Sequence, residues 1–222
     1  GRTRMTTTTT TTAREELFDL VDEKCKPLGI TKARSLVHRD GDWHQAVHVW
    51  VMIWDTWEVV MQQRVLEKDS WPGMWDISSA GHISAGGEPL ESAQREVEEE
   101  LGLKLPKEAF RYLFLHKQEF EGKFHGKKFV NNEFNHVYLV TLKERLPREA
   151  FKLQKEEVRD MKFIGLQELG EKIKRGDKDH CIYLDPDTDS KYFDLFRTVK
   201  KEPEGEWIEV PLNGARARYL AR

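Results

Sequence analysis

The sequence has 222 residues, a formal net charge of −3 and two widely separated cysteines, Cys25 and Cys181. A chain of this length can bury enough apolar surface to fold as one domain with extensions, or as two small domains, without disulfide bonds. The near-neutral charge argues against general nucleic-acid binding, and no apolar run approaches the roughly 20 residues of a membrane span. The two cysteines fit a reducing compartment, so we expect a cytoplasmic protein, with a plastid or another organelle as the alternative.

The N-terminal segment, residues 1–42, is expected to precede the main domain. Residues 1–12 combine GRTRM, typical of a cloning remnant before Met5, with an unbroken run of threonines that predicts disorder. Residues 13–42 begin with a short apolar face formed by Leu17, Leu20 and Val21. This face fits either a short helix or an extended lead-in strand.

The main domain is predicted at residues 43–178, and a C-terminal extension at 179–222. Runs of β-branched and aromatic residues predict strands at 45–54, 58–66, 110–120, 127–134, 135–142 and 160–166. Later helical or amphipathic segments are predicted at 167–176 and 191–201. Because strands and helices mix without a regular rhythm, we expect an α/β fold with a mixed β-sheet between helices.

The clearest helix is predicted at residues 89–101. Pro89 suits the first turn of a helix, and Gly102 suits its end. An apolar stripe at helical spacing is formed by Leu90, Ala93, Val97 and Leu101. We therefore expect this helix to pack on the sheet with its charged residues turned elsewhere.

An unusual cluster of glutamates lies on this helix. Helical spacing places Glu96, Glu99 and Glu100 on one side and Glu98 away from them, while Arg95 can pair with Glu99. Three converging carboxylates need a positive partner, and Mg²⁺ prefers such oxygen ligands. The helix taken alone fits a solvated acidic face better, because charge runs are usually that.

The surrounding residues favour the metal-binding interpretation. The stretch from Gly81 to Leu103 reads GHISAGGEPLESAQREVEEELGL and resembles the Nudix box, G-x5-E-x7-R-E-U-x-E-E-x-G-U, in which U is a bulky aliphatic residue. The positions in register are Gly81, Arg95, Glu96, Val97, Glu99, Glu100, Gly102 and Leu103. One position departs, because Gly87 stands where the box has its first acid, with Glu88 beside it.

This resemblance implies a Nudix-type α/β/α sandwich and metal-dependent cleavage of a diphosphate linked to another group. It implies that Glu96, Glu99, Glu100 and the carbonyl of Gly81 hold Mg²⁺, or Mn²⁺. It also implies catalytic roles for Glu99 and Glu100, and places Arg95 at the substrate.

Residues 17–178 further resemble the Nudix branch related to isopentenyl diphosphate isomerase. By that resemblance Arg64 and Lys68 hold the substrate diphosphate, and Glu133 is catalytic. The isomerases use a cysteine before a Gly-His pair, but this chain has Ala80 there. Because alanine cannot carry a proton, the resemblance favours hydrolysis over isomerisation.

The isomerase-type metal site is predicted to be incomplete. His44 and His82 match metal-binding histidines of that branch, Asn131 stands in place of a glutamate, and His38 lies near a histidine position but out of register. The two matching histidines either bind a transition metal or donate hydrogen bonds to loop backbone.

Three functions remain open on the sequence. The first is a Mg²⁺-dependent diphosphohydrolase acting on a nucleoside diphosphate derivative or an isoprenyl diphosphate. The second is an isomerase-like enzyme, and the third is a non-catalytic binding module. Trp71 and Trp75 flank the glycine-containing loop and either stack on the substrate or pack. The expected partner is a small-molecule diphosphate, without nucleic acid or membrane, and the chain could form a homodimer.

Overall fold

The structure, a computed structural model, describes residues 15–68, 70–124, 126–182, 191–192 and 205–221. Its strands are β1 (Leu17–Val21), β2 (Pro27–Ala33), β3 (Trp43–Ile53), β4 (Glu58–Arg64), β5 (Trp75–Asp76), β6 (Ser79–His82), β7 (Phe110–Phe124), β8 (Lys127–Leu142), β9 (Val158–Gly165), β10 (Glu206–Leu212) and β11 (Ala215–Ala221). Its helices are α1 (Arg34–Asp40), α2 (Pro89–Leu101) and α3 (Leu166–Arg175), with short 3-10 turns η1 (Lys107–Ala109) and η2 (Arg148–Ala150).

The main sheet is mixed, as the sequence predicts. Its strands run in the order β10-β11-β8-β3-β4-β5, and β6, β7 and β9 pair with β3, β8 and β4. Strands β3 and β8 are parallel from the pair Trp43↔Asn132 to the pair Ile53↔Leu142. Because β3 pairs with β4 only at its end and with β6 at residues 46–49, the sheet opens between β3 and β4.

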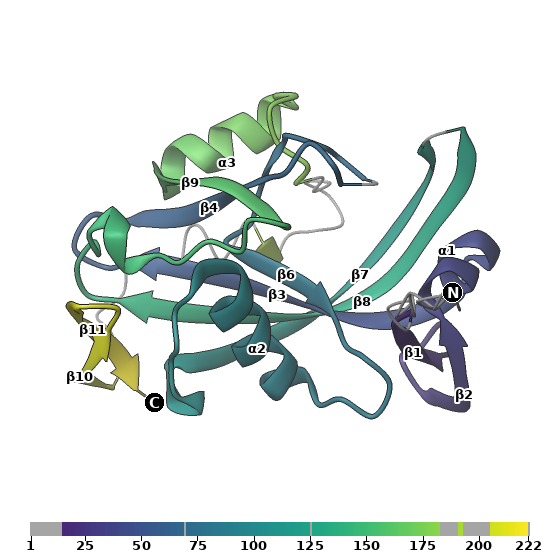
Figure 1. The fold of residues 1–222 in the computed structure, drawn as a ribbon, viewed down its shortest axis with the longest axis horizontal. Coiled ribbons are helices and arrows are strands. Elements are labelled where there is room, and N and C mark those ends of the chain that lie inside the picture. The colour runs from purple at the N-terminus through teal and green to yellow at the C-terminus, as the bar shows by residue number, and fades with distance from the viewer. Residues whose placement is uncertain (1–14, 69, 125, 183–190, 193–204, 222) are drawn as a thin grey trace, which may run out of the picture.

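Two apolar layers cover the sheet and confirm the α/β/α sandwich. Along β3, Val49 and Val51 belong to the layer that includes Val97 of α2. Trp50 and Met52 belong to the opposite layer, which includes residues of α3. This alternation follows from the period of two along a strand. Figure 1 shows α2 and α3 on opposite sides of the sheet.

Helix α2 has the predicted bounds. Pro89 lies in its first turn, where a missing N–H costs nothing. Gly102 adopts the left-handed conformation at φ 70°, and its N–H donates to the Glu98 carbonyl at 2.9 Å. Val97 and Leu101 are fully buried. Local capping and the apolar stripe therefore fix both ends and the rotation of this helix.

The prediction for residues 110–142 is wrong in part. Residues 127–134 and 135–142 are one strand, β8, and Gly122 lies inside β7 rather than ending it. Asn135 pairs with His116 of β7 on one side and Ala46 of β3 on the other. Backbone pairing on both edges thus overrides the turn preference of the asparagines. The tips of β7 and β8 project from the sheet beside α1 (Figure 1).

The N-terminal residues from Leu17 form a small unit of β1, β2 and α1. The lead-in is a strand, because β1 pairs antiparallel with β2. Phe18, Leu20 and Val37 form a separate apolar cluster under this unit. The sequence analysis predicts no element at β2 or α1. A local signal for the end of α1 is nevertheless present, because Gly41 follows the helix in the left-handed conformation at φ 76°.

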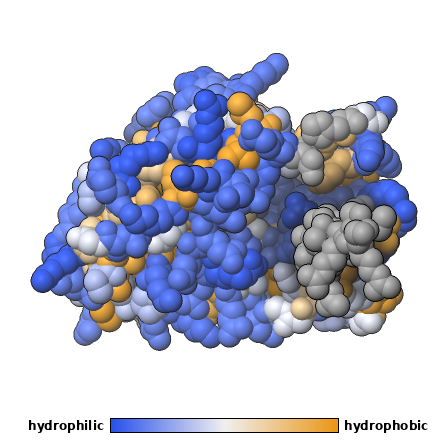
Figure 2. All heavy atoms as spheres, in the orientation of Figure 1, coloured by the Kyte–Doolittle hydropathy of each residue, from blue (hydrophilic) through white to orange (hydrophobic). Residues whose placement is uncertain are grey.

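The C-terminal residues 205–221 extend the sheet. Strands β10 and β11 form a hairpin that joins β8 through the pair Tyr219↔Leu142. Residues 1–12, predicted to be a cloning remnant and a disordered threonine run, lie outside the described residues, as does the predicted segment 191–201 except for its first two residues. No helix among the described residues combines the length and apolar character needed to cross a bilayer. The face in Figure 2 is largely hydrophilic, with apolar residues in scattered areas.

Candidate active site

One cavity of about 300 Å³ brings together the side chains that the sequence singles out. Its lining includes Arg64, Lys68, Gly81, Arg95, Glu96, Glu99, Glu100 and Glu133. The cavity lies where β3 and β4 diverge, next to β6, which pairs with β3 at residues 46–49. Its volume is at the lower end of the range for small-molecule sites.

Gly81 allows the α2 glutamates to reach this cavity. A Cβ atom on Gly81 would overlap the carboxyl carbon of Glu96. The absent side chain lets Glu96 lie directly on β6, where its carboxylate is mostly buried. This contact explains why a glycine at the start of the motif is coupled to a glutamate on the helix that follows.

Arg95 organises two of the carboxylates. Its Nη2 lies 2.8 Å from Glu96 Oε1, and its Nη1 lies 3.1 Å from Glu99 Oε2, which confirms the predicted ion pair with Glu99. Glu99 is 49% exposed, so water can reach it. Glu98 points away and pairs with Lys104 at the surface.

Glu100 is the most buried of the cluster. Its Oε2 accepts hydrogen bonds from Ser79 Oγ at 2.6 Å, Gln62 Nε2 at 2.9 Å and the Ala80 N–H at 3.2 Å. Burial raises the pKa of Glu100 to about 7, although these donors oppose the rise. A nearby cation would stabilise the ionised carboxylate of Glu100, which is buried next to Glu96. The carboxylate oxygens of the two glutamates therefore fit a hard divalent ion.

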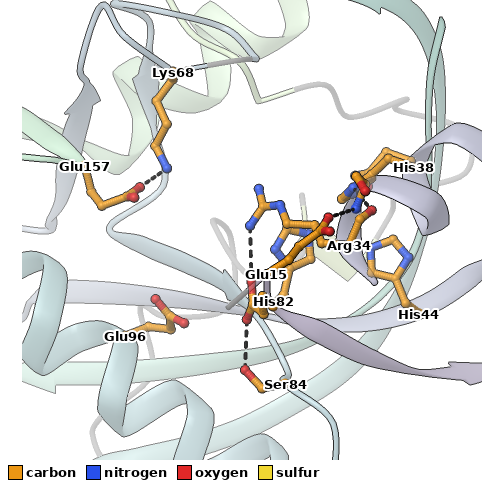
Figure 3. A network of polar contacts seen from close by, with 12 residues as sticks. Glu15, Arg34, His38, His44, Lys68, His82, Ser84, Glu96 and Glu157 are labelled. Atoms are coloured by element: carbon orange, nitrogen blue, oxygen red, sulfur yellow. Dashed lines mark hydrogen bonds and ion pairs between the residues drawn. The ribbon is translucent and has the colours of Figure 1, made fainter. Parts of the chain in front are cut away.

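Arg64 and Lys68 face the carboxylates across the cavity. Arg64 Nη1 lies 3.1 Å from Asp76 Oδ2, and Arg64 Nε donates to the Ser70 carbonyl at 3.1 Å. Lys68 pairs with Glu157, and Figure 3 shows this pair opposite Glu96. Burial and the charge of Arg64 lower the pKa of Lys68 to about 8.

A second cluster joins His38, His44, His82 and Glu133, whose candidate ligand atoms lie within 4.8 Å of one another. The prediction that His38 is out of register is wrong. Helix α1 places His38 Nε2 at 3.0 Å from Asn131 Oδ1 on β8. Figure 3 shows His38 and His44 on the right of the view and His82 nearer its centre. Tertiary packing, not local spacing, brings His38 into the cluster.

Unsatisfied nitrogens indicate that this second cluster fits a metal ion. His44 Nε2 and His82 Nε2 are buried without a well-aligned hydrogen bond from the described residues. Glu133 Oε1 lies 3.5 Å and 3.0 Å from them, and the two histidines hold the pKa of Glu133 well below its usual range. His44 Nδ1 lies 3.1 Å from the Asp42 carbonyl, which is the predicted hydrogen bond to loop backbone. This bond uses only Nδ1 and leaves Nε2 of His44 for a metal ion. Nitrogen and carboxylate donors suit a transition metal.

Several site residues escape the sequence analysis. Gln62 and Ser79 bind Glu100, Glu157 pairs with Lys68, and Phe18 stacks on His82 with ring centroids 4.6 Å apart. No local motif marks them, because each acts through a partner distant in sequence. Of the two predicted tryptophans, Trp71 lines the cavity and Trp75 does not.

Comparisons with known proteins identify the family and the fold of this chain. A family model described as the NUDIX domain matches residues 44–185. The chain is 48% identical over 187 residues to "Nudix hydrolase 3" of Arabidopsis thaliana, covering 84% of this chain and 24% of that protein. The chain thus spans about a quarter of that relative. It is 30% identical over 163 residues to an "Isopentenyl-diphosphate Delta-isomerase" of Streptomyces avermitilis, covering 72% of this chain and 77% of the relative.

A solved structure shares the fold. A protein from Deinococcus radiodurans superposes with a TM-score of 0.57 at 16% identity, covering 84% of this chain and 100% of that one. At this level of identity the likeness concerns the fold alone.

Proposed function

Since this chain belongs to the Nudix hydrolase family, we propose that it hydrolyses a diphosphate linkage in a nucleoside diphosphate derivative or an isoprenyl diphosphate, with Mg²⁺ or Mn²⁺ as its cofactor. The observation that carries the proposal is a single cavity with glutamates of α2 on one side and Arg64 and Lys68 on the other. This pairing of a metal-binding wall with a phosphate-binding wall suits a diphosphate.

The carboxylates would hold the hard ion. Glu96, Glu99 and Glu100, together with the carbonyl of Gly81, supply oxygen ligands of the kind that Mg²⁺ and Mn²⁺ accept. When bound, such an ion neutralises phosphate charge and lowers the pKa of a bound water. Arg95 holds the carboxylates of Glu96 and Glu99 in place through its two ion pairs.

The remaining groups bind phosphate and accept the proton. Arg64 and Lys68 bind diphosphate oxygens, and the fixed guanidinium of Arg64 is already oriented by Asp76. Glu99 is the better placed base, because it is accessible to water. Glu133 is the alternative base, but its two histidine neighbours favour a role as a metal ligand instead.

An isomerase-like activity is the second candidate. The cluster of three histidines and Glu133 favours it, because it completes more of the isomerase-type metal site than the sequence predicts. Ala80 opposes it, because its methyl group cannot donate or accept a proton where the isomerases have a thiol. A test for double-bond migration in isopentenyl diphosphate distinguishes the two. A non-catalytic module is the third candidate, and the retained carboxylates argue against it.

The proposal is tested by phosphate release. Glu99→Gln removes the base and one metal ligand but keeps the shape of the side chain, so we expect kcat to fall by about 10²–10⁴-fold. Glu98→Gln is the matched control, because Glu98 sits on the same helix and pairs with Lys104 outside the cavity. The assay compares both variants with the wild type in Mg²⁺ and in Mn²⁺. Equal phosphate release by Glu99→Gln and the wild type would refute the assignment.

A further inference from the structure

Trp71 connects the segment between β4 and β5 to the projecting part of β7. Its ring centroid lies 4.8 Å from that of Phe120 and 5.4 Å from that of Phe124, and both phenylalanines belong to β7. Figure 1 shows the segment after β4 approaching the tips of β7 and β8. Because β4 and β7 are not paired in the described sheet, this ring contact is a link that the backbone does not provide. Trp71 also lines the cavity.

The two phenylalanines form a fixed surface under the indole. They lie four residues apart on β7, so they project on the same face of the strand. Their rings stack with centroids 5.9 Å apart. A Cβ atom on Gly122, between them, would lie 2.8 Å from the Phe120 ring, so the glycine leaves room for that ring. The strand itself therefore prepares the surface on which Trp71 packs.

The backbone of Trp71 has a conformation that bulky residues rarely adopt. Its φ is 47°, in the left-handed region that costs a side chain with a Cβ atom free energy. Such a conformation persists only where the surrounding structure holds the residue on more than one side. The ring contacts with β7 hold the side chain, and the hydrogen bonds of the neighbouring residue, Ser70, hold the chain before it.

Ser70 in turn orients the guanidinium of Arg64. Arg64 Nε donates to the Ser70 carbonyl at 3.1 Å, and Nη2 donates to Ser70 Oγ at 3.2 Å. On the other side, Nη1 lies 3.1 Å from Asp76 Oδ2. A guanidinium has five N–H groups, and these contacts use three of them. Two N–H groups are thus left for phosphate oxygens, in a plane that Ser70 and Asp76 define.

We propose that Trp71 is a positioning residue for the diphosphate: by packing on the two phenylalanines of β7 it keeps Ser70 against Arg64, and so holds the guanidinium ready for phosphate. The proposal rests on the proposed hydrolase function and deepens it. An arginine that is oriented before the ligand arrives loses less side-chain freedom on binding, which increases affinity. Without the indole, Ser70 would lose its support, and Arg64 would have to be ordered by the ligand itself.

Binding of methylenediphosphonate tests the proposal without turnover. This probe carries no further group on its phosphonates, so stacking of Trp71 on such a group cannot contribute. In calorimetry with Mg²⁺ we expect the dissociation constant of Trp71→Ala to be about tenfold higher than that of the wild type, the size of effect expected from ordering one long side chain. Trp71→Phe keeps an aromatic ring and should bind within about threefold of the wild type.

A double-mutant cycle shows whether Trp71 acts through Arg64. Lysine has neither the Nε nor the Nη2 that bind Ser70. In an Arg64→Lys background, Trp71→Ala should therefore weaken binding by less than about twofold. A merely structural role of the indole would weaken binding equally in both backgrounds. Trp71→Leu takes the place of the alanine variant if the latter does not fold.

Trp57→Ala is the matched control. Trp57 is also a tryptophan in the left-handed conformation, at φ 55°, and its ring also packs on an aromatic neighbour, Trp54, with centroids 4.7 Å apart. It lies in the turn between β3 and β4 and does not line the cavity. We expect this variant to bind methylenediphosphonate as the wild type does.

The outcomes separate this inference from the proposed hydrolase function. Equal affinity of the wild type and Trp71→Ala, with hydrolysis of a diphosphate by both, overturns the inference and leaves the proposed function standing. Equal weakening with Arg64 and with lysine in its place also overturns the inference. Binding that depends on Trp71 only when Arg64 is present, without hydrolysis of any diphosphate, supports the inference and refutes the hydrolase.

Discussion

At the residue scale, burial changes the protonation of the side chains in the cavity. Glu100 has a pKa raised to about 7 and Lys68 a pKa lowered to about 8, in both cases mainly through loss of water. Glu133 is equally buried but stays ionised, because His44 and His82 offset the loss of water. Burial therefore shifts the pKa of each group to a different extent, depending on the charged or hydrogen-bonding partners of that group.

The lowered pKa of Lys68 predicts a pH-dependent KM. Below about pH 8 the ammonium group is charged and attracts the diphosphate, and above it the charge is lost. Between pH 7 and pH 9 we expect KM to rise by up to about tenfold, the change that one ionisation near pH 8 produces. Lys68→Arg should show a flat profile, because arginine stays charged. A parallel rise in both proteins would assign the effect to another group.

At the element scale, the site depends on how closely α2 approaches β6. Local sequence sets the bounds of α2, but Gly81 sets how near the helix can lie. In the long strands β7 and β8, by contrast, local sequence does not set the bounds of the elements. Their residues look like three shorter strands, and β8 is continuous because β7 pairs with it from Lys127 to Val140 and β3 pairs with it from Asn132 to Leu142.

Gly81→Ala tests this close approach. The new methyl group would displace the Glu96 carboxylate, so we expect kcat/KM to fall by about 10²-fold, because a displacement near 1 Å has effects of that size. The free energy of unfolding should fall by about 1–3 kcal/mol from overpacking. Gly170→Ala is the control, because its Cβ would meet open space on α3. Full activity in Gly81→Ala would show that Glu96 does not need its observed position.

At the scale of the whole molecule, the histidine cluster joins parts of the chain that fold as separate elements. His38 comes from the N-terminal unit, His44 from β3, His82 from β6 and Glu133 from β8. A metal ion bound there would connect the N-terminal unit to the sheet. Binding to the folded state alone stabilises a protein in proportion to the logarithm of ligand concentration.

The effect of Mn²⁺ on the free energy of unfolding tests whether a metal ion binds at the histidine cluster. At about 100 times the dissociation constant of Mn²⁺, the free energy of unfolding should rise by about 2.7 kcal/mol per site. His44→Gln should bind one ion fewer per chain and lose that share of the increase, relative to the same protein in chelator. His136→Gln is the control, because His136 bonds Gln45 outside the cluster. Equal metal content in His44→Gln and the wild type would exclude this cluster as a site.

The sequence by itself determined what local geometry controls. The period of α2, its Pro89 start and its Gly102 end placed the glutamates on one side, and the Arg95–Glu99 pair followed from a spacing of four. These features need only contacts within one or two helical turns, so they can be read from a short stretch of chain.

Only the tertiary structure decided which distant residues share the cavity. His38 reaches Asn131 across 93 positions, and His48 reaches Tyr192 across 144. Strand register, the packing of α1 and the packing of Tyr192 on β7 set these contacts, and each depends on the free energy of the assembled core rather than on any local preference. The acid cluster of α2 was therefore predictable, whereas the place of His38 beside His44, His82 and Glu133 was not.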